Sequence, residues 1–157
     1  MRIAVDAMGG DAAPAEIVKG AVAAARSYTD HEIILVGDQG RIQSELTACG
    51  ATLGNISVVH ASQVVDMNES ATVAVRKKVD SSITRGVKLV AEKAADAVVS
   101  AGNTGATVAA SSLFLRTLEH VKRPGIAVSI PTFHGACMVI DAGANIQCKP
   151  AHLMQYG

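Results

Sequence analysis

Residues 97–106 constrain the fold more than any other part of the chain. The β-forming run Ala97–Val99 leads into the Gly-Asn-Thr-Gly turn of residues 102–105, and apolar residues then recur at helical spacing. This order predicts a buried strand, a tight loop and an amphipathic helix. Asn103 or Thr104 can cap the helix, whose first amides have no partner within it. Because such amides attract anions, the loop is a candidate anion site.

The same unit repeats along the chain in weaker form. Apolar runs of strand type occupy residues 3–5, 33–36, 56–59, 126–130 and 136–140. Helical patterns follow Pro14, Gly37 and the pair Ser81-Ser82. This alternation predicts a mostly parallel α/β sheet flanked by helices on both faces, forming a single domain over residues 1–157.

Residues 61–80 break this alternation and contain no clean strand pattern. Arg76, Lys77 and Lys78 supply the nearest cations to the helix that Ser81-Ser82 can cap. A solvated basic face is the ordinary interpretation of such a run. Long irregular segments in compact domains tend to carry function, however, which favours a role in binding.

Polar residues follow three of the expected strands. In parallel α/β sheets, ligands bind beyond the carboxyl ends of the strands. Asp6, the 102–105 loop and Asp141 each come just after an apolar run, so they are expected to share one edge. The alternative is structural: Asp6 would bind backbone amides, and Asp11 would cap the next helix. The segment from Asp141 to Asn145 has the same two interpretations.

Composition and spacing exclude several classes of function. Lys plus Arg and Asp plus Glu both number 14, and Trp is absent, which argues against nucleic acid as a partner. The three cysteines have no metal-ligand spacing and indicate reduced, cytosolic thiols, and no metal site is expected. No apolar run approaches the roughly 18–20 residues of a membrane span. Residues 152–157 resemble the start of a helix, so we expect the chain to be a fragment of a longer protein.

Four segments together resemble the bacterial phosphate acyltransferase family PlsX. They are Asp6-Ala-Met-Gly-Gly-Asp11, Arg76-x-Lys78 with Ser81-Ser82, residues 97–106, and Asp141-x-Gly-Ala-Asn145. The likeness runs over the whole of residues 1–157, with the motifs in the family's order. Members of that family are longer, so the chain resembles their N-terminal portion, truncated at the C-terminus. Their sheet is similar to that of phosphotransacetylases and of isopropylmalate dehydrogenase.

The resemblance implies an activity and its partners. A fatty acyl group would move from acyl-acyl-carrier-protein to inorganic phosphate, forming acyl phosphate for phospholipid synthesis, without a cofactor. The partners would be acyl carrier protein, phosphate and a second copy in a homodimer. The protein would be cytoplasmic, with peripheral contact at the inner face of the membrane through the missing C-terminal portion.

Direct attack of phosphate on the thioester carbonyl is our mechanistic hypothesis, since no nucleophile–base pair stands out. Asn103, as a donor to the developing oxyanion, and Lys78, as a counter-charge, are the candidate catalytic residues. The candidates for binding phosphate and shaping the loops are Asp6, Gly9, Gly10, Asp11, Arg76, Ser81, Ser82, Gly102, Thr104, Gly105, Asp141 and Asn145.

Two other functions fit the same residues. The domain could bind a phosphorylated ligand or carrier protein without catalysis, which a truncated chain favours. A dehydrogenase of this sheet type acting on a small acid is the third hypothesis, although no nicotinamide fingerprint is present.

Overall fold

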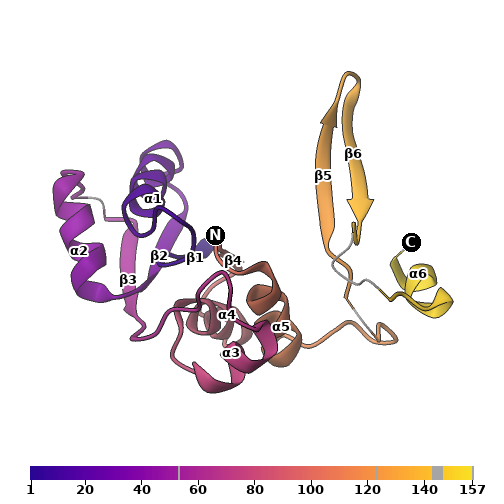
Figure 1. Ribbon diagram of the computed structural model, residues 1–157. Coiled ribbons are helices and arrows are strands. Elements are labelled where there is room, and N and C mark those ends of the chain that lie inside the picture. The colour runs from indigo at the N-terminus through magenta and orange to yellow at the C-terminus, as the bar shows by residue number, and fades with distance from the viewer. Residues whose placement is uncertain (53, 123, 143–146, 157) are drawn as a thin grey trace. The chain divides into compact units, whose positions relative to one another are not determined.

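The computed structural model describes residues 1–52, 54–122, 124–142 and 147–156 (Figure 1). The chain forms two compact units, Met1–Leu115 and Arg116–Gly157. The single domain expected over residues 1–157 stays a prediction.

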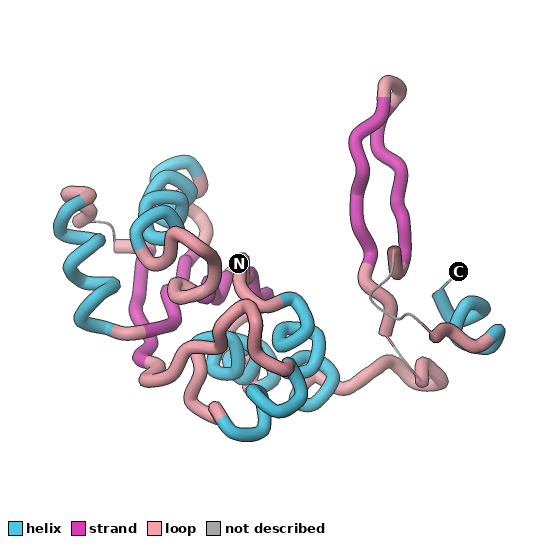
Figure 2. The backbone as a smooth tube through the Cα atoms, in the orientation of Figure 1, coloured by secondary structure: helices cyan, strands magenta, loops and turns pink. Residues whose placement is uncertain are grey.

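The first unit is a parallel sheet with helices. Its elements are β1 (Arg2–Asp6), α1 (Ala15–Ser27), β2 (Glu32–Gly37), α2 (Gln39–Ala48), β3 (Ile56–His60), α3 (Ala71–Lys77), α4 (Ser82–Ala91), β4 (Ala97–Val99) and α5 (Thr104–Phe114). The strand order is β3-β2-β1-β4, and every pair is parallel. Figure 2 distinguishes the strands, in magenta, from the helices, in cyan. The predicted α/β class is therefore confirmed.

Strand β2 shows why helices cover both faces of this sheet. Successive side chains of a strand point to opposite faces. Ile33 and Leu35 pack with α1 and α2 in one core, whereas Ile34 and Val36 belong to a second core together with residues of α4. Because both faces are buried, the strand is a continuous apolar run, as parallel strands usually are.

A third core joins α3, α4 and α5. Its buried members are Val65, Ala74, Val75, Ile83, Val87, Ala106 and Ala110. The segment of residues 61–80 thus contains a short helix, α3, that the sequence pattern did not predict. With seven residues, it carries too few turns to show a clear helical period.

Side-chain caps start two of these helices where the sequence predicts them. Ser81 Oγ accepts a hydrogen bond from the Thr84 amide (3.3 Å) at the start of α4, and Asn103 Oδ1 accepts one from the Ala106 amide (2.9 Å) at the start of α5. Asp11 does not cap α1: that helix follows Pro14, and Asp11 is an exposed turn residue. The capping role considered for Asp11 is therefore wrong.

The second unit contains β5 (Ala127–Thr132), β6 (Gly135–Ile140) and α6 (Pro150–Tyr156). Strands β5 and β6 form their own two-stranded antiparallel sheet, with Ala127 opposite Ile140 and Thr132 opposite Gly135. Asp141 therefore does not follow a strand of the parallel sheet, and this premise of the predicted shared edge is wrong. Among the helices that the structure describes, none combines the length and the apolar character needed to cross a membrane.

Candidate anion site at the carboxyl edge of the parallel sheet

Strands β1 and β4 bring two of the predicted loops together. They are parallel neighbours, with Val5 opposite Val99, so the loops that follow them leave the same edge. Gly9 and Gly102 are in direct contact there. A Cβ on Gly9 would lie 2.8 Å from the Gly102 nitrogen, and one on Gly102 would lie 3.1 Å from the Gly9 Cα. Two glycines are thus needed for the loops to approach this closely.

A buried carboxylate ties these two loops to each other. Asp6 is 1% exposed; its Oδ1 accepts from the Met8 amide (3.1 Å), and its Oδ2 accepts from the Ser100 hydroxyl (2.6 Å). The Ser100 oxygen in turn accepts from the Gly102 amide (3.0 Å). Asp6 therefore has the structural role considered for it, because it binds a backbone amide. Ser100 is a residue that the sequence analysis missed, although its place between β4 and the glycine turn was a usable signal.

The first turn of α5 presents at this edge helix-start amides that have no partner within the helix. The amides of Thr104 and Gly105 precede the first intrahelical hydrogen bond, which runs from the Thr107 amide to the Asn103 carbonyl (3.0 Å). Both residues are exposed. Backbone donors in such a turn, together with the Thr104 hydroxyl, suit a small oxyanion.

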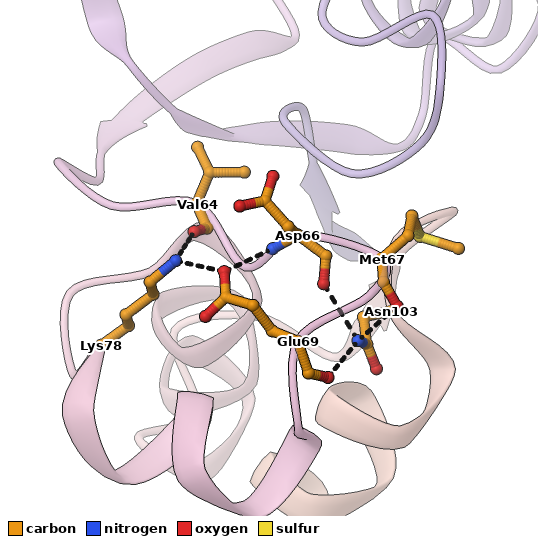
Figure 3. A network of polar contacts seen from close by, with 6 residues as sticks. All are labelled: Val64, Asp66, Met67, Glu69, Lys78 and Asn103. Atoms are coloured by element: carbon orange, nitrogen blue, oxygen red, sulfur yellow. Dashed lines mark hydrogen bonds and ion pairs between the residues drawn. The ribbon is translucent and has the colours of Figure 1, made fainter.

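Asn103 uses its side-chain amide within the protein (Figure 3). Its Nδ2 donates to the carbonyl oxygens of Asp66, Met67 and Glu69, each at 3.1 Å. An amide nitrogen carries two hydrogens, so both are directed at these three acceptors. In this arrangement the side-chain amide of Asn103 has no N–H group left for a thioester oxygen.

Lys78 is also engaged with protein groups. Its Nζ donates to the Val64 carbonyl (2.7 Å) and forms an ion pair with the Glu69 carboxylate. The hydrogen bond from Lys78 is the main reason that the pKa of Glu69 lies below its usual range, and the bond from the Asp66 amide adds to it. The Glu69 carboxylate thus already neutralises the positive charge of Lys78, which was expected from the sequence to meet phosphate.

The remaining candidates lie in different places. Ser81 and Ser82 are buried; the Ser81 hydroxyl donates to Thr84 Oγ1 (2.9 Å), and the Ser82 amide donates to the Gln63 carbonyl (3.1 Å). Arg76 is exposed on α3. Gly10, at φ +109°, lies next to Ala101 and so belongs to the edge.

Two candidates belong to the second unit. Asp141 lies at the end of the hairpin; its amide donates to the Ile126 carbonyl (2.7 Å), and its carboxylate accepts from the Cys148 thiol (3.3 Å). Asn145 lies outside the described residues. In the part of the chain that the structure describes, no cluster of His, Cys, Asp and Glu could hold a metal ion.

Comparison with solved structures defines the class of fold. A phosphotransacetylase from Streptococcus pyogenes matches with a TM-score of 0.71 at 20% identity, covering 99% of this chain and 51% of that one. The EutD phosphotransacetylase from Staphylococcus aureus matches with a TM-score of 0.58 at 21% identity, covering 92% and 47% of the two chains. The chain therefore has a phosphotransacetylase-like fold.

Sequence comparison then gives the family. The family model described as "Fatty acid synthesis protein" matches residues 1–157, and the chain belongs to this family. The phosphate acyltransferase of Halothermothrix orenii is 47% identical over 99% of this chain, and that of Geotalea daltonii is 51% identical over 99%. The chain spans 47% and 45% of these two relatives, slightly less than half of their length. The resemblance drawn from the four motifs is thus confirmed.

Proposed function

We propose that the protein, at the full length of its relatives, transfers a fatty acyl group from acyl-acyl-carrier-protein to inorganic phosphate and so supplies acyl phosphate for phospholipid synthesis. The relatives named phosphate acyltransferase support the transfer to phosphate. The observation that carries the proposal is the first turn of α5, where the exposed residues Thr104 and Gly105 lie at the edge fixed by the Asp6–Ser100 contact.

The chemistry needs no covalent enzyme intermediate. A phosphate oxygen attacks the thioester carbonyl carbon, the new C–O bond forms, and the C–S bond breaks as the carrier thiolate leaves and takes up a proton. We assign phosphate binding to the Thr104 and Gly105 amides and the Thr104 hydroxyl, with Arg76 as the counter-charge. Asn103 and Lys78, whose polar atoms bind the protein itself, act outside the reacting atoms in this scheme.

Phosphate-dependent release of carrier thiol tests the reaction. Full-length protein is mixed with acyl-acyl-carrier-protein that bears a long acyl chain and with phosphate. The acyl phosphate that forms is trapped with hydroxylamine. Thr104→Val should raise the KM for phosphate by at least about tenfold, since a hydrogen bond to a charged group contributes about 1.5–3 kcal/mol. The matched variant Thr47→Val, which removes a hydroxyl bonded to the Gln43 carbonyl on α2, should leave it unchanged. Thiol release that is independent of phosphate would contradict the proposal.

A non-catalytic domain that binds a phosphorylated ligand or carrier protein is the second candidate for this chain by itself. It is favoured by one observation, that the chain spans less than half of its relatives. Phosphate binding by residues 1–157 without acyl phosphate formation, in an assay where a full-length relative turns over, would support it.

We also propose the setting in which the protein works. The family resemblance supports a cytoplasmic homodimer with peripheral membrane contact through sequence beyond residue 157. Sedimentation of the full-length protein with and without anionic vesicles tests the dimer and the membrane contact separately.

A further inference from the structure

We propose that Asn103 and Lys78 are positioning residues, which together hold residues 64–69 (the 64–69 loop) against the first turn of α5. For its kinetic readout this inference rests on the proposed function; its structural readout does not. Both side chains were candidates for direct catalysis on sequence, and the contacts of both lead instead to the same loop (Figure 3).

Asn103 joins the loop to the helix. Its side chain is buried (7% exposed) and is used at both ends: Oδ1 caps α5 through the Ala106 amide, while Nδ2 binds the carbonyls of Asp66, Met67 and Glu69. The residue that starts the helix therefore also sets where the loop lies.

Lys78 holds the same loop from the other side. Figure 3 shows Lys78 and Asn103 approaching the loop from opposite sides, with Glu69 between them. The Glu69 carboxylate forms the ion pair with Lys78, and the Glu69 carbonyl oxygen accepts a hydrogen bond from Asn103 Nδ2. The Val64 carbonyl, bound by Lys78 at 2.7 Å, fixes the start of the loop. The two side chains thus form one network through a shared residue.

The loop continues directly beside the candidate anion site. A Cβ placed on Gly105 would lie 3.0 Å from the Ala71 Cβ, so the start of α3 flanks the first turn of α5. Loosening the loop would displace this wall while leaving the amides themselves in place. We therefore expect weaker phosphate binding and a smaller effect on the chemical step.

Hydrogen exchange on the full-length protein tests the inference. The amides of Asp66 and Glu69 report on the loop, because each bonds within it (2.9 Å to Glu69 Oε1 and 3.2 Å to the Asp66 carbonyl). Asn103→Ser keeps a capping oxygen and removes the donors to the loop, and Lys78→Met removes the ammonium group while keeping most of the stem. Each variant should raise exchange in the 64–69 loop at least tenfold. The matched variant Lys77→Met, exposed on α3, should not.

Kinetics separate positioning from direct catalysis. If the inference holds, both variants raise the KM for phosphate several-fold and change kcat less. A hundredfold loss of kcat in Asn103→Ser, with loop exchange unchanged, overturns it in favour of an oxyanion donor. Unchanged exchange in both variants also overturns it, and if Asn103→Ser does not fold, Lys78→Met decides alone. Absence of acyl phosphate formation in the wild type contradicts the proposed function only, because exchange still reports on the loop.

Discussion

At Gly9, one added methyl group would meet the backbone of a loop more than 90 residues away in sequence. A Cβ there would lie 2.8 Å from the Gly102 nitrogen and 2.9 Å from its Cα, and backbone atoms cannot turn aside as a flexible side chain can. We predict that Gly9→Ala lowers the free energy of unfolding by about 1–3 kcal/mol, the usual cost of overpacking. Denaturant titration of the protein measures it.

Gly20→Ala is the matched control for this prediction. Gly20 lies in α1 with nothing within 4 Å of its Cβ position. Alanine should therefore stabilise the helix by about 0.5–1 kcal/mol. Equal effects of the two variants would mean that the contact between Gly9 and Gly102 does not constrain the fold.

Ser100 carries a second prediction at the scale of one residue. Ser100→Ala removes the donor to buried Asp6 Oδ2 and the acceptor of the Gly102 amide. A buried group left without its partner costs about 1–3 kcal/mol, so unfolding should become easier by about that amount. The control Ser44→Ala removes an exposed hydroxyl that bonds to the Gly40 carbonyl one turn earlier in α2, and should change stability by less than about 0.5 kcal/mol. If both serine variants behave alike, Ser100 does not link the loops.

At the scale of elements, the 64–69 loop connects α3 to α5 through two side chains. Asn103→Ser and Lys78→Met both act on this loop, so their effects on stability should not add. We predict that the double variant departs from the sum of the single variants by more than the ~0.5 kcal/mol within which independent sites agree. In a second cycle that pairs Asn103→Ser with Lys77→Met, the effects of the two variants on stability should add. Additive effects in the first cycle would show two independent contacts.

The helix caps mark what could be predicted from the sequence at this scale. The sequence offered Asn103 or Thr104 and the pair Ser81-Ser82 as caps, because capping joins residues only three positions apart, and the structure selects Asn103 and Ser81. The other end of Asn103 binds carbonyls 34 to 37 residues earlier, and no local pattern announces such a pairing. Arg76-Lys77-Lys78 was equally ambiguous, because only the fold shows that Lys78 faces Glu69.

For the whole molecule too, local patterns could be predicted from the sequence, whereas pairings between distant segments could not. The alternation of apolar runs predicted the α/β class, and the edge shared by Asp6 and the 102–105 loop followed from parallel pairing. The runs at residues 126–130 and 136–140 have strand composition too, but composition does not choose a partner strand. The two strands pair with each other, antiparallel and across a two-residue connection, so Asp141 follows a strand of this hairpin and not one of the parallel sheet.

The stability of the parallel sheet should depend on acid through a contact that joins its first strand to the loop before β4. The Arg2 guanidinium donates to the Asp96 carboxylate (2.8 Å) and the Arg2 amide also binds it (2.7 Å), which lowers the pKa of Asp96 from 3.8 to about 2. A carboxyl whose pKa is lower in the folded state stabilises that state above its unfolded pKa and loses this contribution as the pH falls through its folded value. Asp96 therefore stabilises the fold at pH 7, and its contribution disappears between about pH 4 and pH 2.

Asp96→Asn tests this dependence. The variant should have a lower free energy of unfolding than the wild type at pH 7. This difference in free energy should shrink as the pH falls from 4 to 2, because the wild-type carboxylate then loses its charge too. Denaturant titrations at pH 7, 4, 3 and 2 measure both curves. The exposed Asp11→Asn serves as the control and should follow the wild type throughout. A difference that stays constant down to pH 2 would contradict the prediction, because protonation of the wild-type carboxyl would then not remove its contribution.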